Sequence, residues 1–143
     1  MRAQQVVLTV NGSAQGEEDE GVRLMTTGLL SGKESHWKLR YNEISPDNAV
    51  SHHVTVSMDD GVVTMQREGE FTTSMVFEKG HRFEGNYVTP FGNIEMGVYP
   101  TRVQYQVAEE GKGEVNLQYQ LDLRGQFAAM HEINIRFAPG KHS

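Results

Sequence analysis

The chain contains no cysteine among its 143 residues. Disulfides, thiolate nucleophiles, zinc–thiolate sites and iron–sulfur clusters are therefore excluded. No apolar run approaches the roughly 18 residues that a membrane-spanning helix needs. The first ten residues carry only the short apolar stretch 6–8 and lack the charged-then-apolar layout of a secretory signal. These absences predict a cytoplasmic protein with no membrane partner.

Positive charge is also scarce. Thirteen Lys and Arg face nineteen Asp and Glu, which gives a net charge of −6, and no basic run occurs anywhere in the chain. Binding to a phosphate backbone depends on clustered Lys and Arg. We therefore expect no nucleic-acid partner.

Motifs for catalysis, phosphate binding and metal binding are missing as well. Neither a Gly-x-Ser-x-Gly elbow nor a phosphate-binding loop is present. The neighbouring His52 and His53 point to opposite sides of a strand, and Ile135 stands where a zincin motif beginning at His131 requires its second histidine. We expect no catalytic residue, no metal and no cofactor, and an enzyme with a site beside residues 90–92 is only the weakest alternative.

Turn signals are abundant and regularly spaced. Nine clusters rich in Gly, Pro, Asn, Asp and Ser separate ten segments, most of them 7 to 12 residues long and rich in Val, Thr, Tyr, Phe and Ile. Such composition and spacing favour strands over helices.

Hydrophobic periodicity gives the same result. Apolar residues alternate strictly with polar ones over 114–123, and the same period of two fits the segments around Trp37, Val54, Met75 and Ile133. No helical stripe competes over more than about two turns. The chain is predicted to be all-β.

Short connections between successive strands imply an antiparallel up-and-down meander. A long meander avoids exposed edges by closing into a barrel, here of about 8–10 strands, and an even number lets the first and last strands pair. Pro100 lies inside the long segment 94–107 and cannot donate a ladder hydrogen bond, so a bend is expected there. We expect residues 1–143 to form a single barrel domain, with an open two-sheet sandwich as the alternative.

Several motifs of the chain form a recognisable set, and Thr89-Pro90-Phe91-Gly92 is the most specific of them. The other positions of the set are Thr26-Thr27-Gly28, Leu39, Tyr41, Glu43, Met65, Arg67, Gly69, Met75, Phe77, Gly80, Tyr87, Tyr119 and Leu121. Together they resemble a bacterial family of uncharacterised YwiB-like proteins, although the family more often has Tyr where this chain has Phe91. The resemblance implies a calycin-like, lipocalin-like β-barrel and brings no established activity or catalytic residue. True lipocalins carry Gly-x-Trp on the first strand, whereas Trp37 follows Ser35-His36 on the third, so the lipocalin name covers architecture only.

Polar residues in apolar registers mark the candidate ligand contacts. His131 lies between Ala129 and Ile133, His52 between Val50 and Val54, and Thr73 between Phe71 and Met75. A buried polar group needs a hydrogen-bond partner from the protein or from a ligand. Aromatic residues on the same faces complete the predicted lumen set of Trp37, Tyr41, His52, Thr73, Tyr119 and His131.

Two functions follow. The first is a non-enzymatic barrel that binds a small, largely apolar or aromatic ligand in its lumen. The second is a structural or protein-interaction module with a solid barrel and no ligand, which could form a homodimer. The segment 22–30 supports the second, because Met25 and Leu29 are apolar on one face while Val22, Leu24 and Leu30 are apolar on the other.

Overall fold

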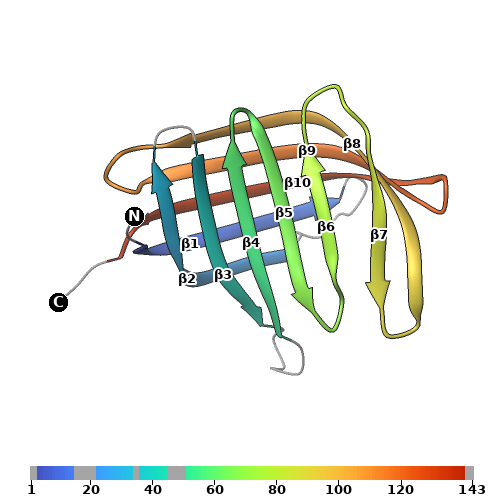
Figure 1. Cartoon of the computed structure of the whole chain (residues 1–143), viewed down its shortest axis with the longest axis horizontal. Coiled ribbons are helices and arrows are strands. Elements are labelled where there is room, and N and C mark those ends of the chain that lie inside the picture. The colour runs from blue at the N-terminus through green and yellow to red at the C-terminus, as the bar shows by residue number, and fades with distance from the viewer. Residues whose placement is uncertain (1–2, 15–21, 34–35, 45–50, 141–143) are drawn as a thin grey trace.

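A computed structural model describes residues 3–14, 22–33, 36–44 and 51–140, and these form ten strands (Figure 1). Their bounds are β1 Gln4–Ala14, β2 Val22–Lys33, β3 His36–Ile44, β4 Ser51–Asp59, β5 Val62–Gly69, β6 Thr73–Phe77, β7 Phe83–Thr89, β8 Gly92–Val107, β9 Gly113–Leu123 and β10 Gln126–Pro139. Every pair of neighbouring strands in the sheet is antiparallel. The all-β meander is confirmed.

Alternating burial shows why these segments are strands. In β4 the even-numbered residues His52, Val54, Val56 and Met58 are buried, while the odd-numbered residues are half-buried or exposed. β6 follows the same rule, and β9 follows it as far as Tyr119. Side chains of a strand point alternately to its two faces, so one face of each strand forms the core.

The sheet closes on itself almost completely. Its order is β6-β5-β4-β3-β2-β1-β10-β9-β8-β7, so the first and last strands pair in the middle and β6 and β7 are the two ends. Those ends meet through two hydrogen bonds of 2.9 Å between the backbones of Thr72 and Val88. The result is a nearly closed antiparallel barrel, consistent with the calycin-like class, and the open sandwich is excluded.

The seam between β6 and β7 is the weak point of this wall. Besides the Thr72–Val88 bridge, only the bridge between Glu78 and His81 in the connecting hairpin joins the two segments. No ladder pairing links Thr73–Phe77 to Phe83–Tyr87, a stretch that the structure describes in full. Arg82 fastens the start of β7 to β9 instead, because its Nη1 lies 2.8 Å from Oδ2 of Asp122. The barrel wall therefore has one seam, between β6 and β7, that is joined by isolated bridges and not by a continuous ladder.

Irregular backbone occurs near two prolines, and the bend predicted at Pro100 is confirmed. The register of β8 against β9 shifts between Pro100 and Arg102, which places a bulge where Pro100 predicted a bend. The Thr-Pro-Phe-Gly segment is the turn between β7 and β8. Thr89 Oγ1 accepts a hydrogen bond from the Phe91 backbone, and Gly92 adopts a φ of 123°.

The barrel is flattened, so its two walls face each other. In Figure 1, β3–β7 run steeply across the long strands β1, β8, β9 and β10. Side chains from the two walls meet in the interior, where the rings of Phe77 on β6 and Tyr119 on β9 are 5.0 Å apart, edge to face. Around this contact lies a continuous core of buried apolar residues.

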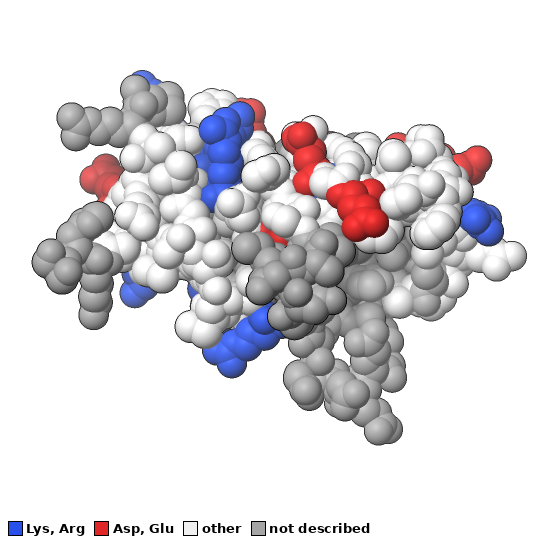
Figure 2. Space-filling view, turned by 90° about the horizontal axis from the view of Figure 1, so that it is seen from below, with Lys and Arg blue, Asp and Glu red and all other residues white. Residues whose placement is uncertain are grey.

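Charged side chains are dispersed on the face shown in Figure 2. Lys and Arg there are separated from one another by wide uncharged areas, and no broad positive surface forms among the residues that can be placed on that face. The described residues include no helix long and apolar enough to span a membrane.

Candidate functional site

Strand register arranges the inward-facing residues of β3–β6 in rows across the wall. One row consists of Trp37, Met58, Val63 and Phe77, and the next of Leu39, Val56, Met65 and Met75. A third row consists of Tyr41, Val54, Arg67 and Thr73. Glu43 and His52 are paired in the row beyond it. Because residues directly opposite on one face have Cβ atoms about 5 Å apart, the polar side chains are concentrated at one end of the interior.

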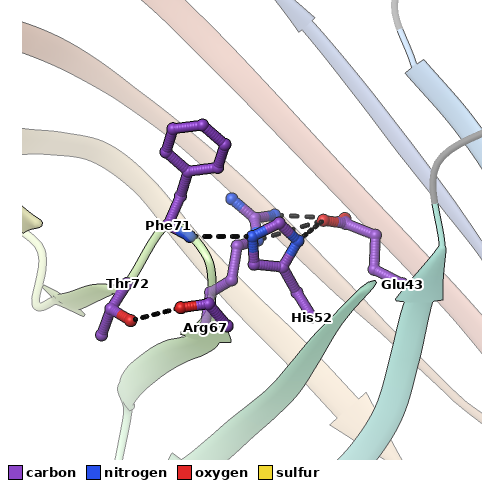
Figure 3. A network of polar contacts seen from close by, with 6 residues as sticks. Glu43, His52, Arg67, Phe71 and Thr72 are labelled. Atoms are coloured by element: carbon purple, nitrogen blue, oxygen red, sulfur yellow. Dashed lines mark hydrogen bonds and ion pairs between the residues drawn. The ribbon is translucent and has the colours of Figure 1, made fainter. Parts of the chain in front are cut away.

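An ion pair between Glu43 and Arg67 forms the centre of this polar end (Figure 3). Arg67 Nη2 donates a hydrogen bond of 3.2 Å to Glu43 Oε2. Arg67 Nε lies 3.2 Å from Glu43 Oε1 but lacks the angle of a hydrogen bond. Both side chains are less than one-third exposed. The pair thus has close charge contact with a single aligned hydrogen bond.

His52 stands beside this pair in a defined orientation. Its Nε2 accepts a hydrogen bond of 3.2 Å from the backbone N–H of Phe71. In a neutral imidazole the other nitrogen then carries the proton. That nitrogen, Nδ1, lies 3.9 Å from Glu43 Oε1, so its N–H faces the carboxylate (Figure 3).

Gly69 makes room for His52. A Cβ atom at this position would lie 2.7 Å from both the His52 ring and the carbonyl oxygen of Ser51. The turn after it is fixed by Thr72, whose hydroxyl donates to the Gly69 carbonyl at 3.3 Å. Local backbone geometry therefore holds the imidazole against β5.

Thr73 supplies a buried hydroxyl with no hydrogen-bond partner. The residue is 4% exposed, its Oγ1 is fully buried, and no acceptor or donor within the described ranges reaches it. Thr73 is paired directly with Arg67 in the β5–β6 ladder. An unsatisfied buried hydroxyl costs roughly 1–3 kcal/mol, which makes this group an exception that requires an explanation.

Two buried tyrosines remain neutral near the same charge. Burial raises the pKa of Tyr119 to about 12, and the nearby Arg67 guanidinium lowers it only in part. Burial and the Glu43 carboxylate raise the pKa of Tyr41 further still, again opposed by Arg67. Both hydroxyls are therefore protonated at neutral pH and can donate hydrogen bonds.

The structure places five of the six predicted lumen residues in two separate groups. Tyr41, His52 and Thr73 lie at the polar end of one wall. Tyr119 and His131 belong to the opposite wall, where their rings stack at 5.5 Å. Trp37 is not brought to the polar end, because it lies four residues from Tyr41 along β3, about 13 Å in an extended strand.

The sequence reasoning missed Glu43 and Arg67 as members of the site. Both were visible in the same alternation, since Glu43 continues the inward series of Leu39 and Tyr41, and Arg67 continues that of Val63 and Met65. Charge alone suggested an outward position. Extending the period of two to the strand ends would have found them.

Other features lie outside the interior. Hollows of about 360, 430 and 690 Å³ are lined mainly by outward-facing residues of the wall. His36, Asp59 and Asp60 form an exposed group, in which His36 Nδ1 lies 2.6 Å from Asp59 Oδ1. An exposed histidine–carboxylate pair of this kind needs no bound metal to explain it.

Comparisons with known proteins agree with this architecture. The model of the family described as "Domain of unknown function (DUF1934)" matches residues 8–135, so the chain belongs to this family. It is 25% identical to the "Uncharacterized beta-barrel protein YwiB" of Bacillus subtilis (strain 168), over 98% of this chain and 99% of that protein. The crystal structure of the YwiB protein from Bacillus subtilis superposes with a TM-score of 0.82 at 21% identity, covering 97% of this chain and 94% of that one. The resemblance noted in the sequence is confirmed.

Proposed function

We propose that this DUF1934 member is a non-enzymatic, single-domain barrel that binds one small, largely apolar or aromatic molecule in its interior. The apolar part of the ligand contacts the core residues, and its polar end contacts Thr73, Arg67 and Tyr41. The observation that carries the proposal is the buried, unpartnered hydroxyl of Thr73 beside a guanidinium. A ligand atom that accepts from Thr73 would satisfy it.

The residues around this hydroxyl are suited to an apolar guest. Met65 and Met75 lie in the neighbouring inward row, and Met96 is buried in the opposite wall. Methionine side chains repack easily because they are unbranched and flexible. Binding is expected to involve movement of these side chains rather than entry into a rigid cavity.

Aromatic rings offer contacts for a flat molecule. Phe71 lies 6.0 Å from the ring of His52 and 6.0 Å from that of Tyr87, measured between centroids. Tyr119 and His131 form the stacked pair on the other wall. Rings in offset or edge-on arrangements attract a further aromatic group.

A ligand screen by thermal unfolding tests the proposal. The panel contains neutral and acidic aromatic molecules, fatty acids and porphyrins, with hits checked by the emission of Trp37, the single tryptophan. A ligand at 100 times its dissociation constant adds about 2.7 kcal/mol of stability, which raises the melting temperature by several degrees.

Paired variants localise any hit. Thr73→Val should weaken binding about five-fold through the loss of one hydrogen bond. Thr55→Val, which removes a hydroxyl from the outer face of β4, should leave binding unchanged. No hit across the panel, or equal effects of the two variants, would count against interior binding.

A second function has its own supporting observation. Val7, Met25 and Leu29 on the outer faces of β1 and β2 are 47%, 73% and 48% exposed. Neighbouring exposed apolar side chains are typical of interaction surfaces. If the chain is instead an interaction module, sedimentation should show a homodimer that Met25→Lys dissociates.

We also propose a cytoplasmic location, supported by the absence of cysteine.

A further inference from the structure

The polar end of the interior is electrically balanced before any ligand arrives. Arg67 brings the positive charge, and its Nε and Nη2 side is held by Glu43 at 3.2 Å. His52 uses Nε2 as an acceptor for the Phe71 backbone, so protonating that nitrogen would break an existing hydrogen bond. The site therefore contains one cation, one anion and an imidazole whose Nε2 accepts a hydrogen bond.

The hydroxyl groups left over can all donate a hydrogen bond. Thr73 has a free hydroxyl, and Tyr41 and Tyr119 keep their protons because burial disfavours the phenolate. Glu43 is the one carboxylate of the network, and it already receives the Arg67 hydrogen bond (Figure 3). A ligand that accepts hydrogen bonds can use these donors.

We propose that the interior site selects ligands whose polar end is an uncharged hydrogen-bond acceptor, such as a ketone, ester or amide carbonyl, over ligands that end in a carboxylate. This inference rests on the proposed function and specifies its ligand class.

Glu43 is the group that makes this selection. A buried anion loses its hydration and needs a compensating charge at short range. The charge of Arg67 is already neutralised by Glu43, and the Glu43 carboxylate would repel the carboxylate of a ligand. A carbonyl oxygen loses far less hydration and still accepts from Thr73.

The test compares two molecules of nearly equal shape. 2-Acetylnaphthalene ends in a neutral carbonyl, and 2-naphthoate ends in a carboxylate that is ionised at pH 7.5. Isothermal titration calorimetry of the wild-type protein should show 2-acetylnaphthalene binding at least about ten-fold more tightly, since like charge and desolvation both oppose the acid. A third probe, 2-naphthamide, should behave like the ketone.

Glu43→Gln should abolish the preference. The substitution keeps the size of the side chain and removes its charge, so 2-naphthoate should gain at least about ten-fold in affinity while 2-acetylnaphthalene changes by less than about three-fold. The matched control is Glu84→Gln. Glu84 also pairs with an arginine, 3.5 Å from Arg82, but its side chain is 78% exposed and lies outside the polar end. Neither probe should respond to it.

The outcomes separate this inference from the proposed function. Two results would overturn only the proposed selection for neutral acceptors. One is tighter binding of 2-naphthoate than of 2-acetylnaphthalene by the wild type. The other is an unchanged ratio of the two affinities in a Glu43→Gln protein whose circular dichroism shows it folded. If Glu43→Gln does not fold, the wild-type ranking of the three probes decides the question. Failure of all three probes to bind overturns the ligand class and counts against interior binding as well.

Discussion

The two ends of the barrel interior are built from the same strands yet differ in chemistry. At the apolar end, one row across β4–β6 places Met58, Val63 and Phe77 completely out of contact with solvent. At the polar end, the row that contains Arg67 and Thr73 lies only four residues further along these strands. Strand alternation is therefore uniform, and only the identity of the inward residues changes.

The two ends therefore contribute differently to the stability of the fold. Burying apolar side chains stabilises the fold by about 25 cal/mol for each Å² removed from water, so the apolar end supplies stability. Burying Thr73 unpaired and enclosing an ion pair contribute little or oppose folding. Stability does not explain the polar end, which is where the proposed ligand site lies.

The largest expected effect is at the apolar end. Phe77→Ala removes the ring that contacts Tyr119 across the barrel and should lower the free energy of unfolding by about 3–5 kcal/mol, measured by urea denaturation. Phe91→Ala is the control, because Phe91 is 95% exposed in the β7–β8 turn and its loss should change stability by less than about 0.5 kcal/mol. Similar losses in the two variants would contradict the assigned core.

High pH should weaken the barrel through its buried tyrosines. The pKa of Tyr119 is raised from about 10 when unfolded to about 12 when folded, so its contribution is complete below pH 10 and is lost as the pH rises toward 12. The loss is up to about 3 kcal/mol, in the same direction as that of Tyr41.

Urea unfolding at pH 8, 10 and 11 checks this dependence. Tyr119→Phe should flatten the decline above pH 10, while Tyr99→Phe, on the outer face, should not. An identical decline in the wild type and Tyr119→Phe would show that this hydroxyl is not shielded by folding.

At the polar end, the stability cost of a glycine substitution should come from crowding rather than from a cavity. Gly69→Ala places a methyl group against the His52 ring and the Ser51 carbonyl and should cost about 2 kcal/mol of stability. Gly92→Ala has open space around the added methyl group. It meets only backbone strain at a φ of 123°, so it should cost about 1 kcal/mol of stability. The difference between the two melting temperatures measures the packing of His52, and equal shifts would contradict that packing.

The smallest effect is expected for the unpartnered hydroxyl itself. Thr73→Val keeps the shape of the side chain and removes a group without a hydrogen bond, so stability should stay within about 1 kcal/mol of the wild type, on the stabilising side. A loss of 2 kcal/mol or more in urea denaturation would mean that Thr73 has a partner in the folded protein.

Several parts of the fold and the site could be predicted from particular residues. The alternation of Val115, Leu117 and Tyr119 determined which face of β9 is buried, and Pro100 located the bulge in β8. His52 and Thr73 were found because they interrupt apolar registers. Their neighbours Glu43 and Arg67 were not found, because a charged residue near a strand end is usually solvated. Only the pairing of strands shows that these two side chains point inward and that each neutralises the charge of the other.

By itself, the sequence determined the strands, their turns and the inward face of each one, because side-chain alternation and turn chemistry are local properties of the chain. Only the tertiary structure decided which inward residues meet. Strand register placed Arg67 beside Thr73 and against Glu43, and the crossing of the two walls brought Phe77 to Tyr119. It also placed the weak seam between the consecutive strands β6 and β7 rather than between the first and last strands. Register and closure depend on how all ten strands fit together, and no local pattern encodes that fit.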